Sequence, residues 1–267
     1  MNIEFTAERP GDADVLAFIV TKSSFADFEF PLEKAGMIRE TAKLARFEGG
    51  VGQSFLLINE EGGKLVRIVL LGVAEGDAGD YQKAGGDVIA KVQTSGAKHI
   101  AIHGANLSGT AAAEAAYGAL LRNWRIDKYR TKLAETSKPT VTAVTVVGAN
   151  GEAAAAWPRY AAIADGVALT RELVAEPANI IYPESFVERC MHLAEMGVEI
   201  TVLDVPAMEK LGMGALLGVG QGSRRPSRML AMKWDGTGGT QERPLAFVGK
   251  GVTFDTGGIS IKPAAGM

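Results

Sequence analysis

Two lysines and one aspartate lie close together in the last part of the 267-residue chain. Asp255 comes five residues after Lys250, and Lys262 comes seven residues after Asp255. Apolar residues such as Val252 and Phe254 flank them, where a surface loop would carry Ser, Asn and Glu. The segment therefore predicts charged groups held partly out of water, where they must be paired or bound to metal.

Metal binding would give each of these side chains a chemical role. A lysine amine keeps its proton up to about pH 10.4, so it binds a metal only when neighbouring positive charge makes it neutral. Two divalent ions would do so at Lys250, and Asp255 could bridge them. A protonated Lys262 could polarise a substrate carbonyl or stabilise an oxyanion. From spacing alone another interpretation stays open, in which Lys250 and Lys262 are solvated lysines on a turn-rich hairpin.

Two further functions stay open from the residues alone. Ser260 and Lys262 would share one face of a strand, as a serine hydrolase dyad requires, although no elbow glycine follows Lys262. Residues 1–150 could instead form a non-catalytic module that binds a small ligand or a partner. In that module Gly104 and Gly109 would line a crevice at the carboxyl edge of a sheet.

The first part of the chain alternates short β-branched apolar runs with alanine-rich amphipathic stretches. Such alternation predicts helices packed on a largely parallel sheet, which is an α/β fold. The predicted strands are 15–20, 54–58, 65–73, 99–103 and 141–147. The predicted helices are 32–47, 81–94 and 110–128.

The rest of the chain predicts a second α/β domain. Residues 1–150 form the expected N-terminal domain, 151–175 a connecting helix, and 176–267 the first part of a second domain, each domain having a mostly parallel or mixed sheet flanked by helices. In the second domain helices are predicted at 183–196 and 206–211, and strands at 199–203, 215–219, 229–233 and 245–248. So short a sheet would leave an apolar edge unpaired, so this domain is expected to be incomplete in the chain.

Composition excludes several classes of protein. The net charge of −3 gives no clear signal for nucleic acid, which requires clustered Lys and Arg. No apolar run reaches about 18 residues, so no membrane span is predicted. Cys190 is the only cysteine, so no internal disulfide can form. Together with the lack of a signal-peptide pattern in the first residues, this favours a cytoplasmic location.

Other short motifs are excluded by the residues around them. Gly251 follows Lys250 where a phosphate loop needs Ser or Thr. His99 and His103 are four residues apart without the glutamate of a zincin motif, so packing or strand-end roles are expected. Cys190, between apolar neighbours on a predicted helix, is expected to be a small core residue.

The segment from Val248 to Pro263 resembles the first metal-binding segment of the leucyl aminopeptidase family, also called cytosol aminopeptidases. Thr256 stands where members of that family usually carry Ser. Residues 171–179 resemble the family's entry into its catalytic domain, and residues 213–223 resemble the strand and turn before its active site. The resemblance is specific from about residue 170 onward.

The resemblance implies a dinuclear metallo-exopeptidase that removes N-terminal residues, often Leu, from peptides. Carried over by position, Lys250 would bind one metal ion, Asp255 would bridge both ions, and Lys262 would be the electrophilic catalytic lysine. Mn²⁺, Zn²⁺ or Mg²⁺ could occupy such a site. The family commonly forms hexamers, so a homo-oligomer is also implied.

The family's remaining ligands correspond to positions beyond Met267. They are two more aspartates and a glutamate, and an arginine helps to position the reacting groups. A catalytic metal usually needs about three protein ligands, and Asp235 and Glu242 are not expected to replace those that are absent. The chain is therefore expected to be a truncated aminopeptidase that is inactive by itself; a natural degenerate relative is the alternative.

Overall fold

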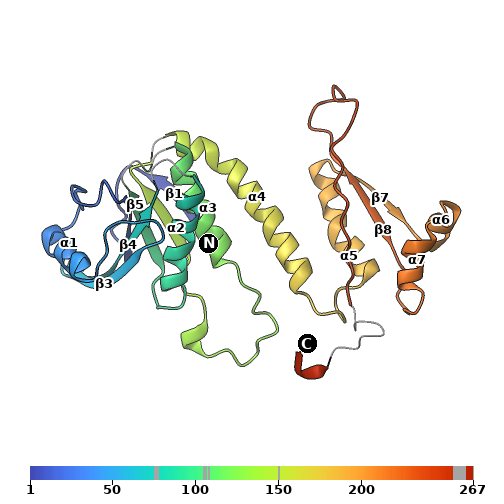
Figure 1. The fold of residues 1–267 in the computed structure, drawn as a ribbon, viewed down its shortest axis with the longest axis horizontal. Coiled ribbons are helices and arrows are strands. Elements are labelled where there is room, and N and C mark those ends of the chain that lie inside the picture. The colour runs from blue at the N-terminus through green and yellow to red at the C-terminus, as the bar shows by residue number, and fades with distance from the viewer. Residues whose placement is uncertain (75–77, 105–106, 108, 150, 255–262, 267) are drawn as a thin grey trace. The chain divides into compact units, whose positions relative to one another are not determined.

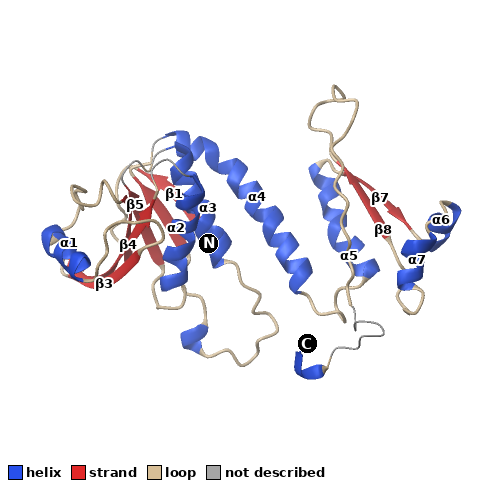
Figure 2. Ribbon diagram, viewed as in Figure 1, coloured by secondary structure: helices blue, strands red, loops and turns tan. Residues whose placement is uncertain are grey.

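The computed structural model describes residues 1–74, 78–104, 107, 109–149, 151–254 and 263–266. Contacts between residues divide the chain into two compact units, Met1–Arg171 and Glu172–Met267. Figure 1 shows both units along the chain, and Figure 2 shows their helices and strands.

The first unit is built on a six-stranded sheet with the order β1-β6-β5-β2-β4-β3. Neighbouring strands run parallel except for the antiparallel hairpin of β3 and β4. The largely parallel sheet predicted from the sequence is thus confirmed, and β1 is an additional edge strand. The strands are β1 (Asn2–Thr6), β2 (Val15–Thr21), β3 (Ser54–Glu61), β4 (Lys64–Val73), β5 (His99–Gly104) and β6 (Ala143–Val147).

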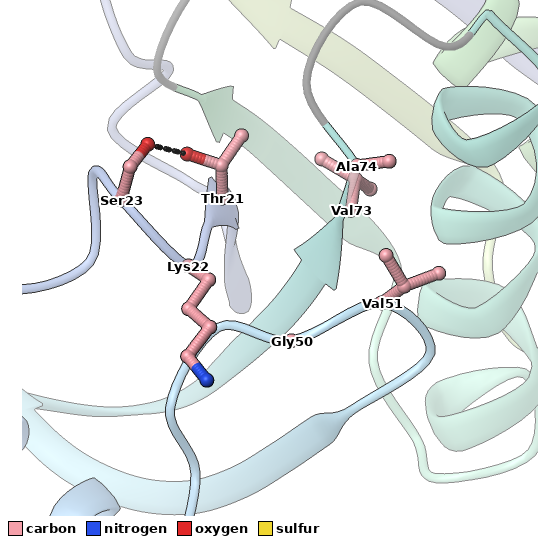
Figure 3. Close-up of a pocket in the computed structure, with 7 residues that line it drawn as sticks. All are labelled: Thr21, Lys22, Ser23, Gly50, Val51, Val73 and Ala74. Carbon is pink, nitrogen blue, oxygen red and sulfur yellow. Dashed lines mark hydrogen bonds between the residues drawn. The ribbon is translucent and has the colours of Figure 1, made fainter.

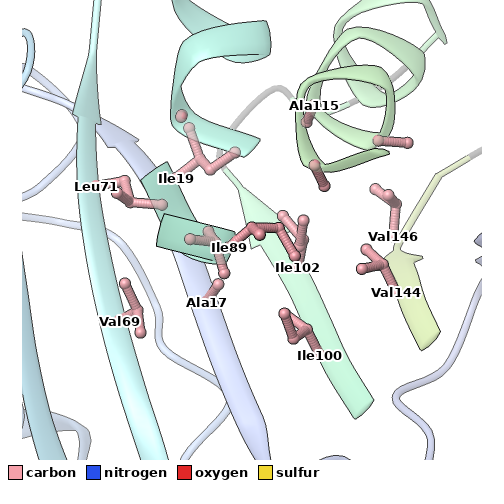
Figure 4. Close-up of a cluster of buried hydrophobic side chains, with 14 of the residues drawn as sticks. Ala17, Ile19, Val69, Leu71, Ile89, Ile100, Ile102, Ala115, Val144 and Val146 are labelled. Carbon is pink, nitrogen blue, oxygen red and sulfur yellow. The ribbon is translucent and has the colours of Figure 1, made fainter. Parts of the chain in front are cut away.

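Helices cover both faces of this sheet, as the continuous apolar run of β2 requires. Helix α1 (Ala35–Leu44) packs on one face with Leu16, Phe18 and Val20 of β2. Helices α2 (Ala78–Val92) and α3 (Gly109–Asn123) pack on the other face with Ala17 and Ile19, in the cluster shown in Figure 4. Every residue of β2 is buried, so this strand lies at the centre of the core.

Helices α2 and α3 approach each other closely through glycines. A Cβ atom at Gly85 would lie 1.9 Å from the carbonyl oxygen of Ala115, and one at Gly118 would lie 1.7 Å from that of Gln82. Both distances are far below van der Waals contact, so only glycine fits at these two positions. The backbones of the two helices therefore touch directly.

Helix α4 (Gly151–Ala175) continues from the first unit into the second. Its first turns pack on unit 1, where Trp157 contacts Phe5 and the Tyr160 hydroxyl donates to Glu114 at 2.7 Å. Arg171 donates to the carbonyl of Leu121, at the end of α3. The connecting helix predicted over 151–175 is confirmed and is continuous through Pro158.

The second unit has a small antiparallel sheet of two strands. Asp204 caps helix α6, because its carboxylate accepts a hydrogen bond from the Ala207 amide at 3.0 Å. Its regular elements are α5 (Pro183–Cys190), the 3₁₀ turn η2 (Met191–Met196), β7 (Glu199–Leu203), α6 (Val205–Lys210), α7 (Gly214–Gly220) and β8 (Met229–Lys233). Two short 3₁₀ turns elsewhere are η1 (Glu135–Ser137) and η3 (Ala264–Gly266).

Two predicted strands of this unit are wrong. Residues 215–219 lie in helix α7, because a short apolar run between glycines fits a helix as well as a strand. Residues 245–248 form no strand, and an extended segment becomes a strand only when its backbone pairs with a neighbour. None of the helices in the described ranges is long and apolar enough to span a membrane.

Candidate functional site

Lys250 lies in an exposed segment that follows β8. All described residues from 234 to 252 are exposed, and the segment contains a turn at residues 236–239 but no strand. Phe254 is also exposed. The expectation that Lys250 is held partly out of water is therefore wrong in this structure, because the apolar residues around it do not pack against a core.

The other two candidate residues, Asp255 and Lys262, lie outside the described residues, as does Ser260 of the alternative dyad. In the described part of the chain, no group of three or more His, Cys, Asp or Glu side chains could hold a metal ion. Lys250 is thus the one proposed ligand whose position the structure gives, and the bridging role of Asp255 stays a prediction.

The nearby carboxylate of Asp235 serves the turn after β8. It accepts hydrogen bonds from the Thr237 hydroxyl at 2.7 Å and from the Thr237 amide at 2.9 Å. These hydrogen bonds stabilise the ionised form and lower the pKa of Asp235. The Asp235 carboxylate therefore stabilises the turn that follows β8.

A buried ion pair joins the end of helix α4 to helix α5. Arg189 Nη1 lies 2.7 Å from Glu176 Oε1, and the Glu176 side chain is fully buried while that of Arg189 is 31% exposed. Glu172 lies 3.7 Å from the same Arg189 nitrogen. The pair fixes α5 against the segment 171–179, which resembles the family's entry into its catalytic domain.

Arg225 forms a second anchor within this unit. Its guanidinium group lies 3.8 Å from the centre of the Tyr182 ring, close enough for a cation–π interaction. Tyr182 is the N-cap residue of α5, and Arg225 belongs to the loop between α7 and β8. The loop that leads into β8 is therefore attached to α5.

Sequence reasoning missed both anchors. Arg189 lies on α5 and Glu176, thirteen positions earlier, follows the end of α4, so no helical spacing joins them. Arg225 lies in the run Arg224-Arg225-Pro226, which gives no sign that its side chain has a partner. The sequence does not say that this partner is Tyr182.

The residues set aside as structural have the expected roles. His99 begins β5 and lies between Asp12, at 3.0 Å from Nδ1, and Thr145, at 2.8 Å from Nε2. His103 is buried and stacks on Phe18, and burial lowers its pKa to about 4. Cys190 is buried at the end of α5, and this burial raises the pKa of its thiol.

A hollow of about 440 Å³ opens at the carboxyl edge of the sheet in unit 1. It lies where the parallel strands β2 and β4 end, at Thr21 and Val73. Figure 3 shows the hydroxyl groups of Thr21 and Ser23 on one side and Val51, Val73 and Ala74 on the other. Sequence reasoning placed a crevice at this edge but beside Gly104 and Gly109, which do not line the hollow.

The family sequence models match most of the chain. Residues 168–267 match the catalytic domain of the cytosol aminopeptidase family, and residues 23–133 match its N-terminal domain. The chain belongs to the cytosol aminopeptidase family. This is a peptidase family with dinuclear metal catalysis. The family membership that the resemblance of residues 248–263 implied is thus confirmed.

Proteins named "Probable cytosol aminopeptidase" are similar over most of this chain. The one from Afipia carboxidovorans is 43% identical over 242 residues, which are 86% of this chain and 48% of that protein. The one from Sinorhizobium fredii is 38% identical over 279 aligned residues, which cover 100% of this chain and 56% of that protein. The chain thus spans about half the length of these relatives.

Two solved structures have a similar fold. A tomato leucine aminopeptidase mutant matches with a TM-score of 0.80 and 26% identity, covering 97% of this chain and 55% of the tomato chain. The bottromycin maturation enzyme BotP in complex with Mn matches with a TM-score of 0.69 and 26% identity, covering 95% of this chain and 51% of BotP.

Proposed function

We propose that this chain supplies the N-terminal domain and the first metal-binding segment of a metal-dependent aminopeptidase. The substrate would be a peptide, from which the enzyme releases the N-terminal residue, with Leu preferred. The observation that carries the proposal is the position of Lys250, Asp255 and Lys262 inside the region that matches the family's catalytic domain. The relatives are named cytosol aminopeptidases, which supports a cytoplasmic enzyme. Members of the family commonly form hexamers, which supports a hexamer here.

Each of the three residues has a proposed role. Lys250 would present a neutral amine to one ion, and Asp255 would present its carboxylate to both. Lys262 would stay protonated, and it would donate to the oxygen that gains negative charge when water attacks the scissile carbonyl. When bound, two divalent ions would supply a nucleophile at neutral pH by lowering the pKa of a bound water.

The donor set of this chain fits such a centre only in part. A catalytic metal usually takes about three protein ligands, and two ions that share one carboxylate need more donors than one lysine adds. Within the residues that the structure describes, no carboxylate or histidine cluster fills the gap. We therefore propose that the 267-residue chain does not hydrolyse peptides by itself.

The proposal for the metal ions rests on a structural neighbour. BotP, a structural neighbour at 26% identity, is described in complex with Mn. We propose Mn²⁺ or Zn²⁺ as the ions, with Mg²⁺ as the weaker candidate, because a lysine nitrogen is a poorer ligand for a hard cation than oxygen is.

A completed chain tests the proposal. Residues 1–267 are joined to the carboxyl-terminal half of the Afipia carboxidovorans relative, and hydrolysis of leucine p-nitroanilide is measured with added Mn²⁺. The chimera should be active and should lose activity on chelation, whereas the 267-residue chain should be inactive under the same conditions. Activity that survives chelation and is blocked by a fluorophosphonate would instead support the Ser260 and Lys262 dyad.

A matched pair of lysine variants assigns the activity to the proposed ligand. In the chimera, Lys250→Ala should lower kcat/KM by at least about 100-fold, because even changes to residues that only orient a metal ligand reach that size. Lys233→Ala, which removes an exposed lysine of β8, should leave kcat/KM unchanged. Equal activity of the Lys250→Ala variant and its parent would contradict the proposed role.

A further inference from the structure

Strand β3 forms one border of the six-stranded sheet and has a single neighbour, β4, which Figure 2 shows beside it. Among the described residues, no backbone group of β3 bonds to any segment other than β4. The outer side of the β3 backbone therefore presents N–H and C=O groups to solvent. Such a row of groups is a template for pairing with another strand.

The side chains of this border strand do not protect it from pairing. Residues 53–59 carry no charge, and Leu56 and Ile58 are 40% and 64% exposed. Edge strands that stay unpaired are commonly short and carry charged residues. The opposite border of the sheet follows that rule, because β1 has five residues and the exposed Glu4 at its centre. The two borders of the sheet are therefore unequal, and β3 is the one open to another strand.

An uncovered apolar patch lies on one face of the sheet at this border. Leu56 is opposite Val69 of β4 in the register, so both side chains lie on the same face, with Ile58 two residues further along β3. Val69 is buried in the cluster under α2 and α3, whereas Leu56 and Ile58 are outside it and exposed. Leu65 of β4 lies on the same face and is 77% exposed. We call Leu56, Ile58 and Leu65 the border patch.

The sequence of β3 is complementary to itself in the antiparallel direction. When two copies of β3 run antiparallel about Leu57, Leu56 of one protomer lies opposite Ile58 of the partner subunit, and Glu60 lies opposite Ser54. Apolar residues then meet apolar residues in the border patch, and no charged residue meets a like charge. A centre at Ile58 would instead put Leu56 opposite Glu60. The register about Leu57 is therefore the favoured one.

We propose that two copies of this chain associate through β3, with their sheets joined into one continuous sheet across a twofold axis at Leu57. The backbones pair along residues 54–60, and the two border patches meet on one side of the joined sheet. An unrelated extended peptide fits less well, because a second β3 already supplies apolar residues at both facing positions. The contact lies within unit 1 and does not rest on the proposed peptidase function.

Sedimentation velocity of the full 267-residue chain tests the contact, with EDTA present so that metal does not contribute. The chain carries Phe247→Glu and Val248→Glu, which remove two exposed apolar side chains of unit 2 as a second cause of association. A monomer–dimer equilibrium is expected as the concentration rises from the micromolar to the millimolar range, because a twofold contact closes at the dimer. A chain that stays monomeric, or one that grows beyond the dimer without limit, would overturn the proposal.

Amide hydrogen exchange distinguishes strand pairing from association at another surface. The β3 amides that point away from β4 should exchange at least about tenfold more slowly in concentrated than in dilute samples, because they become hydrogen-bonded in the dimer. The amides of β1, at the opposite border, should not change. This measurement needs no variant of β3, so it does not depend on how such variants fold. Unchanged exchange along β3 in a sample that forms dimers would contradict the proposed contact.

Two charge variants test the register. Leu56→Lys or Ile58→Glu alone should weaken the dimer by at least about tenfold, because each places a charge opposite an aliphatic side chain. The two changes together should give a tighter dimer than either alone, because the new lysine of each protomer then faces the new glutamate of the other. A double variant that is no tighter than the single variants would overturn the proposed pairing.

A matched control separates the border patch from other exposed apolar residues of unit 1. Ile163 is 42% exposed on α4, the helix whose Trp157 contacts Phe5 of β1 at the opposite border. Ile163→Lys should therefore leave the dimer unchanged. Equal weakening by Ile163→Lys and Leu56→Lys would show that β3 is not the contact. None of these results bears on the peptidase proposal, since the chelator removes metal throughout.

Discussion

At the scale of single residues, the Glu176 carboxylate is a buried group that needs a partner of opposite charge. Its side chain is fully buried, and an ionised carboxylate without water must be paired or hydrogen-bonded. Arg189 supplies one partner at 2.7 Å, while its own partial exposure keeps some of its hydration. The buried member of the pair therefore loses most when the pair is broken.

Replacement of Arg189 should destabilise the second unit strongly. Arg189→Met keeps much of the side-chain length but leaves the Glu176 carboxylate without its arginine, and we expect a loss of about 2–4 kcal/mol. Lys233→Met is the matched control, because it breaks the exposed pair with Glu199 and should cost no more than about 1 kcal/mol. Urea unfolding followed by circular dichroism measures both. Equal losses in the two variants would show that burial of Glu176 does not matter.

His103 couples the stability of the first unit to pH. Its ring is buried and stacked on Phe18, and no described residue is a hydrogen-bond partner of its Nε2. Burial, with the charge of Arg9 as a smaller cause, lowers its pKa to about 4. Between about pH 6.5 and pH 4 the unfolded chain binds the proton and the folded unit does not, so acidification lowers the free energy of unfolding.

His103→Phe should remove this pH dependence while keeping a ring against Phe18. From about pH 7.5 down to pH 4, the native unit should lose up to about 3 kcal/mol more than the variant. Hydrogen exchange at β2 and β5 amides reports the unfolding of unit 1. His192→Phe, at an exposed histidine of the other unit, should leave this slope unchanged. Parallel pH curves for His103→Phe and the parent would contradict the assignment.

At the scale of elements, the sequence predicted those whose residues pack against a core. Five strands of unit 1 and its helices are apolar in a regular pattern, and each has a neighbour in the sheet. Strand β1 was missed although Asn2, Glu4 and Thr6 alternate with apolar residues as in a half-buried strand, because five residues are a short stretch for this pattern. Residues 215–219 were assigned to a strand because glycine and short apolar runs do not separate strand from helix. The domain boundaries at residues 150 and 175 stay predictions.

The contact of helices α2 and α3 gives a test within one helix. Gly85→Ala should destabilise unit 1 by about 1–3 kcal/mol, because the new methyl group overlaps the Ala115 carbonyl. At the next residue, Gly86→Ala has ordinary contacts of 3.5 Å or more and should be neutral or stabilising by up to about 1 kcal/mol. Thermal unfolding of both variants decides this. A stabilised Gly85→Ala variant would show that the helices do not touch as described.

At the scale of the whole chain, unit 2 exposes several large apolar side chains. Phe247 is 89% exposed and Val248 is fully exposed, and Leu245, Phe254 and Trp234 are also exposed. Large exposed apolar patches mark surfaces that bind other polypeptide or aggregate. The chain spans about half the length of its relatives.

Dye binding should report this surface. We expect the 267-residue chain to bind the apolar dye ANS and to self-associate as its concentration rises, because the 245–248 segment is apolar and unpaired. The double variant Phe247→Glu and Val248→Glu should reduce both without changing the thermal unfolding of unit 1. The chimera with the relative's carboxyl-terminal half should bind less dye than the chain alone. Equal dye binding by all three proteins would contradict this account.

The sequence proposes a chemistry for the candidate site but no geometry. Lys250, Asp255 and Lys262 were found from residue type, spacing and family resemblance, all of which are local in sequence. Metal ligation depends on donors brought together from distant positions, and the described residues contain no such cluster. Lys250 is exposed because the apolar residues around it do not pack against a core.

The most direct test of the central claim is manganese anomalous diffraction from crystals of the chimera. The account predicts two manganese peaks, with Lys250 Nζ bound directly to one ion and the Asp255 carboxylate bound to both. Two occupied manganese sites with the Lys250 amine pointing into solvent would contradict it.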